Sequence, residues 1–312
     1  MKIKLDIVSG FLGAGKTTLI KKLVTEGYKD EKIVVLENEF GKVGIDTDIL
    51  KNTGVEVEEI TAGCICCSSS GDFLSSIEDI INKFSPNRII VEPTGVAKLS
   101  EILRACNDFK FKGLFEVNNI ISVLDVKRFD FVASYSKVFV DDQIAVSKTI
   151  VLSKNIGVDI KHIEDIYSYI KNININANII NEDIYNISGQ ELVNAIENEI
   201  EEYDMLKLLN KLDKTAETRN PYHFATLEFK THKLIDYENI ELIFKCFEDE
   251  DTYGKIVRGK GILQNSEQNW YKFDYVENEI QEENYYKEDI GAICIIGYKL
   301  NKKNILKLFD WW

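Results

Sequence analysis

The residues best suited to chemistry lie near the start of the chain, where residues 10–17 read Gly-Phe-Leu-Gly-Ala-Gly-Lys-Thr. This is the G-x-x-x-x-G-K-[ST] phosphate loop, whose backbone N–H groups converge on the phosphates of a nucleotide. Lys16 is expected to reach the β- and γ-phosphates, and the Thr17 hydroxyl is expected to bind Mg²⁺. An apolar run precedes the loop and helical spacing follows it, as the motif requires. The sequence therefore predicts a nucleotide-binding protein.

A second acidic motif, residues 91–95, ends a predicted strand and contains Glu92. In nucleoside triphosphatases a carboxylate at such a strand end holds Mg²⁺ through water. A glycine three residues later, here Gly95, senses the γ-phosphate through its N–H group. The alternative is a glutamate that caps a turn before a helix. The phosphate loop favours the functional interpretation, with Lys16, Thr17, Glu92 and Gly95 as the catalytic group.

Residues 36–46 combine acidic side chains with glycines directly after another predicted strand. Such a segment suits a switch loop that orders around Mg²⁺ and the γ-phosphate. Taken alone, the same residues would be read as a turn. The acidic residues assigned to the switch are Glu37, Glu39 and Asp46.

Three of the six cysteines, Cys64, Cys66 and Cys67, lie within four residues of one another. Thiolates at this spacing on a tight loop can bind one cation such as Zn²⁺, Cu(I) or Co²⁺. No second Cys or His pair follows at zinc-finger distance, so the ligand set is incomplete and suits a transfer site. A redox pair and buried structural cysteines are the alternatives. The other three, Cys106, Cys246 and Cys294, lie in apolar patterns and are expected in the core.

Composition and charge limit the classes of partner that the chain is expected to bind. The 312 residues carry a net charge of −14 and no basic stripe, so nucleic acid is not expected as a partner. The N-terminus lacks a signal-peptide layout, and no apolar run approaches the ~20 residues of a membrane span. We therefore expect a cytoplasmic protein with no membrane partner and with reduced cysteines.

Strand-like and helical patterns alternate through the first two thirds of the chain, which predicts an α/β fold with a mostly parallel sheet. Ligands of such sheets bind at the carboxyl ends of the strands, where the phosphate loop lies. Strands are expected at residues 3–8, 32–37, 55–60, 88–91, 119–124, 149–152 and 178–180. Helices are expected at residues 16–26, 72–84, 97–106, 142–146, 160–170 and 189–200.

The pattern changes in the last third, which predicts a second domain. We expect a P-loop domain over residues 1–200, a linker over 201–220 and a smaller α+β domain over 221–312. The smaller domain alternates like strands at residues 223–229, 256–263, 270–275 and 292–296, with one helical stretch at 235–248.

Four motifs occur in a fixed order: the phosphate loop, Glu-Asn-Glu-Phe-Gly from Glu37, Gly-Cys-Ile-Cys-Cys from Gly63, and Glu-Pro-Thr-Gly from Glu92. This order resembles the CobW-type GTPase family, metal-handling relatives of the hydrogenase and urease nickel-insertion GTPases. Residues 258–261, Arg-Gly-Lys-Gly, look like the start of a strand in the C-terminal domain of that family. The resemblance covers essentially the whole chain.

The resemblance implies a P-loop GTPase that binds GTP and Mg²⁺ and delivers Zn²⁺ or Co²⁺ to a client metalloprotein. We expect a monomer, or a homodimer that forms with nucleotide or metal, because sharing the metal site across a dimer would complete a partial ligand set. The expected nucleotide-binding residues are Gly10, Gly13, Ala14, Gly15, Lys16, Thr17, Thr18, Ser153 and Lys154. Thr17, Glu37, Glu39, Asp46 and Glu92 are expected at the Mg²⁺ or switch positions, and Cys64, Cys66 and Cys67 on the transferred metal.

The chain departs from the family where guanine is read. The family pattern Asn-Lys-x-Asp is replaced by Ser153-Lys154-Asn155-Ile156, so the aspartate that accepts two hydrogen bonds from guanine is absent at its position. Asp159 comes three residues too late to replace it. Discrimination against ATP should weaken, although GTP remains the expected nucleotide.

Two other functions share these motifs. One is a nucleotide-dependent activation factor for a cobalamin-dependent enzyme, in which the cysteines are structural. The other is a small-molecule kinase, which would need a positioned base and an acceptor pocket; the sequence suggests neither. The family's frequent His-rich stretch is also missing, which favours stoichiometric delivery of metal over storage.

Overall fold

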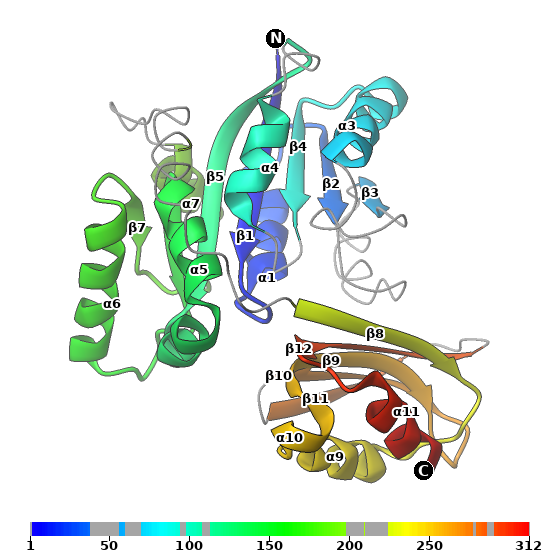
Figure 1. Cartoon of the computed structure of the whole chain (residues 1–312). Helices are drawn as coiled ribbons and strands as arrows, with labels where there is room; N and C mark the ends of the chain where they lie inside the picture. Colours follow the sequence, from blue (N-terminus) through cyan, green and yellow to red (C-terminus); the bar gives the residue numbers. More distant parts are fainter. Residues whose placement is uncertain are drawn as a thin grey trace. The chain divides into compact units, whose positions relative to one another are not determined.

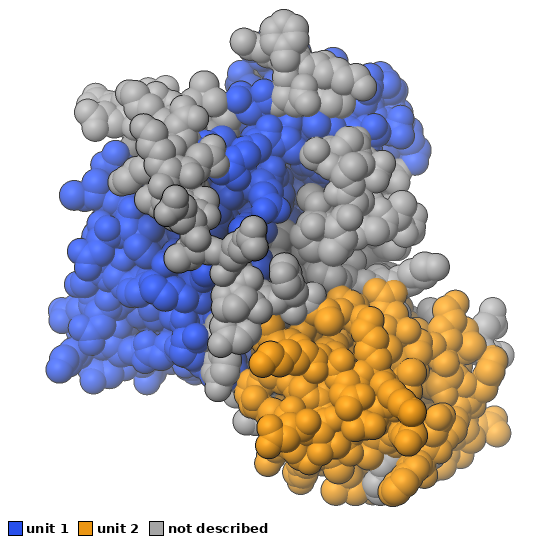
Figure 2. Space-filling view, viewed as in Figure 1, with its two compact units in different colours: residues 1–39, 46–219 blue, residues 40–45, 220–312 orange. Residues whose placement is uncertain are grey.

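The computed structural model describes residues 2–37, 56–59, 70–93, 98–107, 113–197, 209, 224–276, 279–285 and 290–311. Contacts between Cα atoms divide the chain into two compact units (Figure 2). The first contains the described residues up to Leu209, and the second begins at Phe224.

The first unit is built on a seven-stranded parallel sheet with the order β3-β2-β4-β1-β5-β6-β7 (Figure 1). The predicted α/β fold with a parallel sheet is therefore confirmed. The strands are β1 Ile3–Gly10, β2 Ile33–Glu37, β3 Glu56–Glu59, β4 Arg88–Glu92, β5 Phe115–Asp125, β6 Thr149–Ser153 and β7 Asn178–Ile180. The helices are α1 Lys16–Lys22, continued by a π-helix at Leu23–Gly27, then α3 Ser70–Phe84, α4 Leu99–Cys106, α5 Phe129–Val146, α6 Ile160–Ile173 and α7 Gly189–Glu197.

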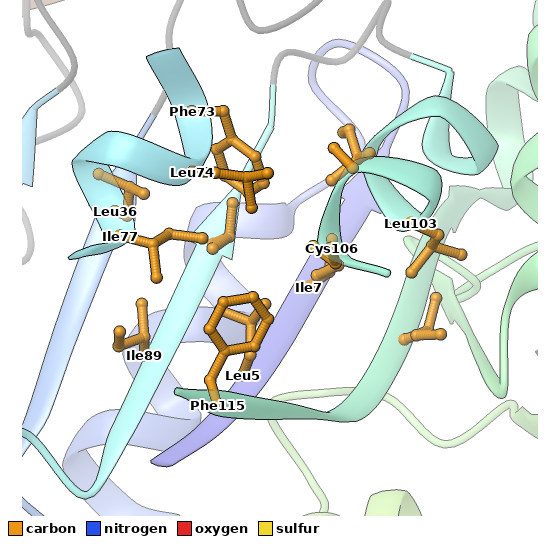
Figure 3. Close-up of a cluster of buried hydrophobic side chains, with 14 of the residues drawn as sticks. Leu5, Ile7, Leu36, Phe73, Leu74, Ile77, Ile89, Leu103, Cys106 and Phe115 are labelled. Carbon is orange, nitrogen blue, oxygen red and sulfur yellow. The ribbon is translucent and has the colours of Figure 1, made fainter. Parts of the chain in front are cut away.

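Helices cover both faces of this sheet. Consecutive side chains of a strand point to opposite faces, so alternate strand residues pack against different helices. On one face, α3 and α4 pack against alternate strand residues (Figure 3). That cluster includes Leu5, Ile7, Leu36, Ile89 and Phe115 of the strands and Phe73, Leu74, Ile77, Leu103 and Cys106 of the helices. On the other face, Leu19 and Ile20 of α1 and Leu192 of α7 pack with the intervening strand residues Val8, Val35 and Ile90.

Helix α5 is longer than the sequence predicts, because it begins at Phe129 and not near residue 142. Its first half is rich in aromatic and β-branched residues, which have lower helix propensity and hide the helical pattern. The buried side chains Phe129, Val132, Val140 and Ile144 nevertheless recur at helical spacing. Ser136 has non-helical dihedral angles (φ −127°, ψ 28°) and marks a kink within the helix.

The second unit contains a five-stranded antiparallel sheet with the order β11-β10-β9-β12-β8 (Figure 1). Its α+β character is as predicted, but β11, the short helix α10 and the last helix were not. Strand β11 is an acidic edge strand, and polar edge strands lack the apolar alternation that identifies inner strands. The elements are β8 Phe224–Thr231, α9 Tyr237–Cys246, α10 Glu250–Tyr253, β9 Lys255–Gln264, β10 Trp270–Val276, β11 Glu279–Asn284, β12 Gly291–Tyr298 and α11 Lys302–Trp311.

The glycines of the Arg-Gly-Lys-Gly motif have a packing role in strand β9. A Cβ atom on Gly259 would lie 2.3 Å from Cζ of Phe244, and one on Gly261 would lie 2.4 Å from Cε1 of Phe273. The Phe244 ring also stacks on Tyr275, with 4.2 Å between the ring centroids. The motif thus lets aromatic rings lie directly against the strand backbone.

The prediction of core cysteines holds for two of the three residues and is wrong for the third. Cys106 and Cys294 are buried, whereas Cys246 is exposed at the end of α9. Buried Ile240, Phe244 and Phe247 follow the helical spacing of one apolar face, and position 246 falls outside it.

A buried arginine joins several elements of the first unit. Arg88, at the start of β4, is fully buried and hydrogen-bonds the carboxylate of Asp6 in β1. Its Nε and Nη2 atoms lie 2.7 Å and 3.0 Å from the two carboxylate oxygens of Glu31, and Nη2 lies 2.7 Å from Oε1 of Glu197 in α7. The Tyr28 ring covers the guanidinium, with 3.7 Å between Cζ of Arg88 and the ring centroid. Burial alone would lower the pKa of Arg88, but the Glu31 hydrogen bonds and the charge of Asp6 raise it, so the guanidinium stays charged.

Asp6 links the same cluster to strand β5. Its Oδ1 accepts hydrogen bonds from the backbone N–H of Asn119 and from Nδ2 of Asn118, each at 3.0 Å. Burial raises the pKa of Asp6, and the neighbouring Arg88 opposes this rise. The carboxylate therefore depends on these two donors and on the adjacent cation.

Replacing Arg88 by methionine should leave three carboxylates of the cluster without their shared cation. Removing one partner of a buried ion pair costs about 3–5 kcal/mol, and we expect a loss of that size in the free energy of unfolding of Arg88→Met. Urea denaturation monitored by circular dichroism measures it. Lys4→Met is the matched control, because Lys4 meets the same cluster at its exposed rim, with Nζ 3.7 Å from Oε1 of Glu197. An Arg88→Met loss as small as that of Lys4→Met would contradict the assigned role.

Titration of Glu197 should make the free energy of unfolding depend on pH. Burial alone would raise its pKa, but hydrogen bonding to Arg88 and the charges of Arg88 and Lys4 lower it below the ordinary value of 4.5. A depressed pKa stabilises the folded state above pH 4.5, and this contribution disappears as the pH falls through the folded-state pKa. Glu197→Gln should therefore lower the free energy of unfolding at pH 7 and flatten its decline on acidification. Urea titrations between pH 7 and pH 3 test this, with the exposed α6 residue Glu164 changed to Gln as control.

Candidate functional site

The loop between β1 and α1 has the backbone that the glycine pattern predicts. Gly13 and Gly15 have φ angles of 73° and 97°, a region that side chains with a Cβ atom rarely adopt. Gly10 approaches its neighbour closely, since a Cβ atom there would lie 2.4 Å from the Val123 carbonyl oxygen. Gly15 is the N-cap of α1 and provides no side-chain cap for the helix. Such a loop and helix start leave N–H groups available for an anion.

Lys16 and Thr17 of the phosphate loop both meet Glu92, which ends β4. The Thr17 hydroxyl donates to the Glu92 carboxylate, with Oγ1 at 3.3 Å from Oε1 and 3.1 Å from Oε2. Nζ of Lys16 lies 3.6 Å from Oε1 of Glu92 and 3.5 Å from the Phe11 carbonyl oxygen. Lys16 is only 6% exposed, so its charge lies in a largely desolvated site. Residues 75 positions apart thus form one cluster.

Parallel strand pairing explains why this cluster forms. Ile7 of β1 is the register partner of Val91, so the ends of β1 and β4 reach the same edge of the sheet. Glu37 ends β2 and is the register partner of Glu92. The backbone therefore places the first residue of the predicted switch beside Glu92.

The opposite side of the phosphate loop meets the end of β6. Oγ of Ser153 donates to the Ala14 carbonyl oxygen at 2.7 Å and lies 3.2 Å from the Leu124 carbonyl oxygen. Lys154 has a φ angle of 55°, and its Nζ lies 2.7 Å from Oδ2 of Asp125. These contacts bring Ser153, Lys154 and Ala14 together, as the sequence predicts for nucleotide-binding residues. Thr18 is exposed in the first turn of α1.

Asp125 was missed by the sequence analysis. It ends β5, accepts a hydrogen bond from the backbone N–H of Lys127 at 3.1 Å, and pairs with Lys154. A carboxylate at the carboxyl end of a buried strand was the available signal, because that edge of a parallel sheet carries the ligand.

The remaining predicted site residues lie outside the part of the chain that the structure describes. They are Glu39, Asp46 and Gly95 of the switch segments and Cys64, Cys66 and Cys67 of the metal motif. Within the described ranges, no group of three His, Cys, Asp or Glu side chains is arranged to hold a metal ion. None of the helices in those ranges is long and apolar enough to cross a membrane.

The residues around the phosphate loop fit a nucleotide with its magnesium ion. Mg²⁺ prefers oxygen ligands and retains several waters, and the Thr17 hydroxyl and Glu92 carboxylate offer oxygens side by side. Lys16 adds a buried positive charge suited to phosphate oxygens. The arrangement can therefore bind a phosphorylated ligand and a hard cation together.

Comparison with known proteins identifies several relatives. The zinc chaperone CobW of Sinorhizobium sp is 34% identical over 131 residues, covering 40% of this chain and 37% of the relative. The zinc chaperone YeiR of Escherichia coli (strain K12) is 32% identical over 150 residues, covering 48% of this chain and 46% of the relative. This chain thus spans less than half the length of these two proteins.

A longer alignment joins the chain to the zinc-regulated GTPase metalloprotein activator 1 of Schizosaccharomyces pombe. It is 26% identical over 309 residues and covers 88% of this chain and 75% of that protein. The crystal structure of Zn(II)-bound YjiA GTPase from E. coli aligns with 100% of this chain and 99% of its own, at 18% identity and a TM-score of 0.45.

The family model for the CobW/HypB/UreG nucleotide-binding domain matches residues 4–181. The match runs from β1 to just past the end of β7 and so includes the phosphate loop and Glu92. It covers more than half of the 312 residues, which shows that the chain belongs to the CobW/HypB/UreG family.

Proposed function

We propose that this protein is a GTP-hydrolysing metallochaperone that binds Zn²⁺ or Co²⁺ at its Cys-x-Cys-Cys segment and delivers the ion to a client metalloprotein. The observation that carries the proposal is the joint contact of Lys16 and Thr17 with Glu92. It joins the phosphate loop to the strand end that bears the second acidic motif. The names of the relatives, zinc chaperones and a zinc-regulated GTPase metalloprotein activator, support the metal role.

In this proposal the phosphate loop holds the triphosphate through backbone N–H groups and Lys16. Thr17 and Glu92 would hold the magnesium ion, with Glu37 at the next strand end. The ion supplies charge neutralisation on the phosphates when it is bound. Lys16 is kept in place by Glu92 and the Phe11 carbonyl, so little reorganisation is needed for it to meet phosphate oxygens. Hydrolysis then rests on positioning and charge, with no covalent intermediate on the protein.

Strand pairing connects the proposed nucleotide site with the strand that precedes the cysteine segment. Glu59, the last residue of β3, is the register partner of Glu37, which is the partner of Glu92. Two strand spacings, about 10 Å, therefore separate the backbone of Glu59 from that of Glu92. Cys64 follows Glu59 by five residues. We propose that GTP orders the switch segments and tightens the cysteine site, and that hydrolysis loosens it.

Substitutions in the cluster test the nucleotide part of the proposal. Lys16→Ala should abolish tight binding of GTP, because it removes the buried charge that faces the phosphates. Glu92→Gln should lower kcat by about 10²-fold or more, as expected for loss of a group that stabilises transition-state charge. Thr17→Ala should weaken the Mg²⁺ dependence of binding. Phosphate-release kinetics and nucleotide titrations at varied Mg²⁺ measure these effects.

Thr25→Ala is the matched control for Thr17. Thr25 lies in the following π-helix, and its exposed hydroxyl donates only to the Lys21 carbonyl oxygen among the contacts observed. Full GTP hydrolysis by Glu92→Gln, or equal losses in Thr17→Ala and Thr25→Ala, would contradict the assigned roles.

Metal affinity in different nucleotide states tests the coupling. A chromophoric chelator should report tighter Zn²⁺ and Co²⁺ binding with a non-hydrolysable GTP analogue than with GDP, by about 5–150-fold for ordinary coupling free energies. Reciprocity requires each metal to raise the preference for the analogue over GDP by the same factor that the analogue raises the affinity for that metal. Cys66→Ser should remove the effect, because it removes one proposed thiolate ligand.

Cys246→Ser is the control for thiol loss, since Cys246 is an exposed cysteine of α9. Sedimentation of the same samples shows whether nucleotide or metal drives formation of a homodimer, which could complete a partial ligand set. Equal metal affinities with GTP analogue and GDP would refute nucleotide-gated delivery.

A further inference from the structure

The structure indicates how a bound nucleotide would be oriented along the sheet edge. The contact between Thr17 and Glu92 marks the end that takes Mg²⁺ and the terminal phosphate, on the β4 side of β1. The strand order continues from β1 to β5 and β6 on the other side. A nucleotide whose phosphates occupy the loop must therefore extend its sugar and base toward the ends of β5 and β6.

The loop after β6 lies at that end and beside the phosphate loop. The Ser153 hydroxyl donates to the Ala14 carbonyl oxygen, and a Cβ atom on Gly15 would lie 4.0 Å from Cβ of Ser153. Lys154 follows in a left-handed conformation and pairs with Asp125 at the end of β5. Residues 153–156 are thus held next to the phosphate loop, where the base must be read.

The polar side chains of this loop and its surroundings already have protein partners. Nδ2 of Asn155 donates to the backbone carbonyl of Asn181 at 2.5 Å and lies 3.2 Å from its Oδ1. The Asp159 carboxylate caps α6 by accepting from the backbone N–H of Lys161 at 3.2 Å. The Asp125 carboxylate holds Lys154. The side chains of Asn155, Asp159 and Asp125 thus hold the loop and the start of α6 in place.

Ile156 is the next residue of the loop, and its side chain is 65% exposed. Guanine presents N1–H and its exocyclic amino group as adjacent donors, which a carboxylate accepts well. Adenine presents an amino donor beside an acceptor nitrogen. An aliphatic side chain pairs with neither pattern, and apolar contacts discriminate weakly between ligands of similar shape. A site that hydrogen-bonds one edge can discriminate by a factor of about 10⁴ or more, and position 156 offers no such bond.

We propose that the nucleotide site accepts adenine and guanine nucleotides with similar affinity, and that Ile156 is the residue that makes it permissive. The proposal deepens the proposed function and rests on it, because the same phosphate loop binds both ligands. The triphosphate provides the affinity, and the base contributes contact area without selection. Either purine nucleoside triphosphate can then drive the switch.

Competition binding tests this directly. A fluorescent GDP analogue is displaced by GDP, ADP and non-hydrolysable GTP and ATP analogues, each with Mg²⁺. We expect the guanine and adenine members of each pair to differ by less than about threefold in Kd. Ile156→Asp should raise the preference for guanine by about tenfold or more, mainly through tighter GDP binding.

Ile175→Asp is the matched control. Ile175 is 75% exposed and lies in the connection from α6 to β7, at the amino-terminal edge of the sheet. The control makes the same change of charge away from the nucleotide edge and should leave both affinities unchanged. Because both isoleucines are exposed, neither substitution should prevent folding.

The outcomes separate the two proposals. A wild-type preference for guanine above about thirtyfold overturns the permissive site and leaves the proposed GTPase standing. Equal effects of Ile156→Asp and Ile175→Asp also overturn it, because position 156 would then not face the base. Failure to bind any of the four nucleotides overturns the proposed function together with the inference.

Discussion

The nucleotide-binding unit depends on one buried cation. Arg88 starts strand β4, and its guanidinium is shared by Asp6, Glu31 and Glu197 from three other parts of the unit. This cluster fixes β4 beside β1, because Asp6 lies within β1 and Arg88 is the register partner of Lys4, two residues before Asp6. Four residues further on, the same strand ends at Glu92. The ionic cluster at one end of β4 therefore determines where the carboxylate at its other end meets the phosphate loop.

The two ends of β4 use charge differently. At the amino end, one cation meets three carboxylates at short distances through four hydrogen bonds, and a tyrosine ring covers it. At the carboxyl end, Nζ of Lys16 lies 3.6 Å from Oε1 of Glu92 and 3.5 Å from the Phe11 carbonyl oxygen. Long contacts of this kind are readily exchanged for phosphate oxygens, whereas the bidentate contacts of Arg88 are not. The start of β4 thus provides tight internal bonding, and its end provides contacts that a ligand can replace.

Sequence reasoning found the parts whose signal is local. The phosphate loop is continuous in sequence, and the buried parallel strands are apolar runs, so both could be located without a structure. The Arg88 cluster could not, because its members are isolated polar residues that become a unit only through tertiary contacts. The same holds for the pairing of Asp125 with Lys154. The first part of α5 was missed because aromatic and β-branched residues hide its helical pattern, and β11 because a polar edge strand lacks apolar alternation. Cys246 was wrongly placed in the core because it lies among apolar residues, although it falls outside their helical face.

The position of β3 in the sheet affects how firmly the chain that follows it is anchored. Among the described strands it stands last in the parallel sheet and pairs with β2 alone, through four register positions, whereas β4 is held on both sides by β1 and β2. Displacing β3 breaks a single ladder and leaves both ladders of β4 intact. The chain that runs on toward Cys64 thus leaves the sheet from a strand held by one described ladder of four register positions. A small shift of β3 would therefore move the start of that chain while the pairing of β4 with β1 and β2 stays as it is.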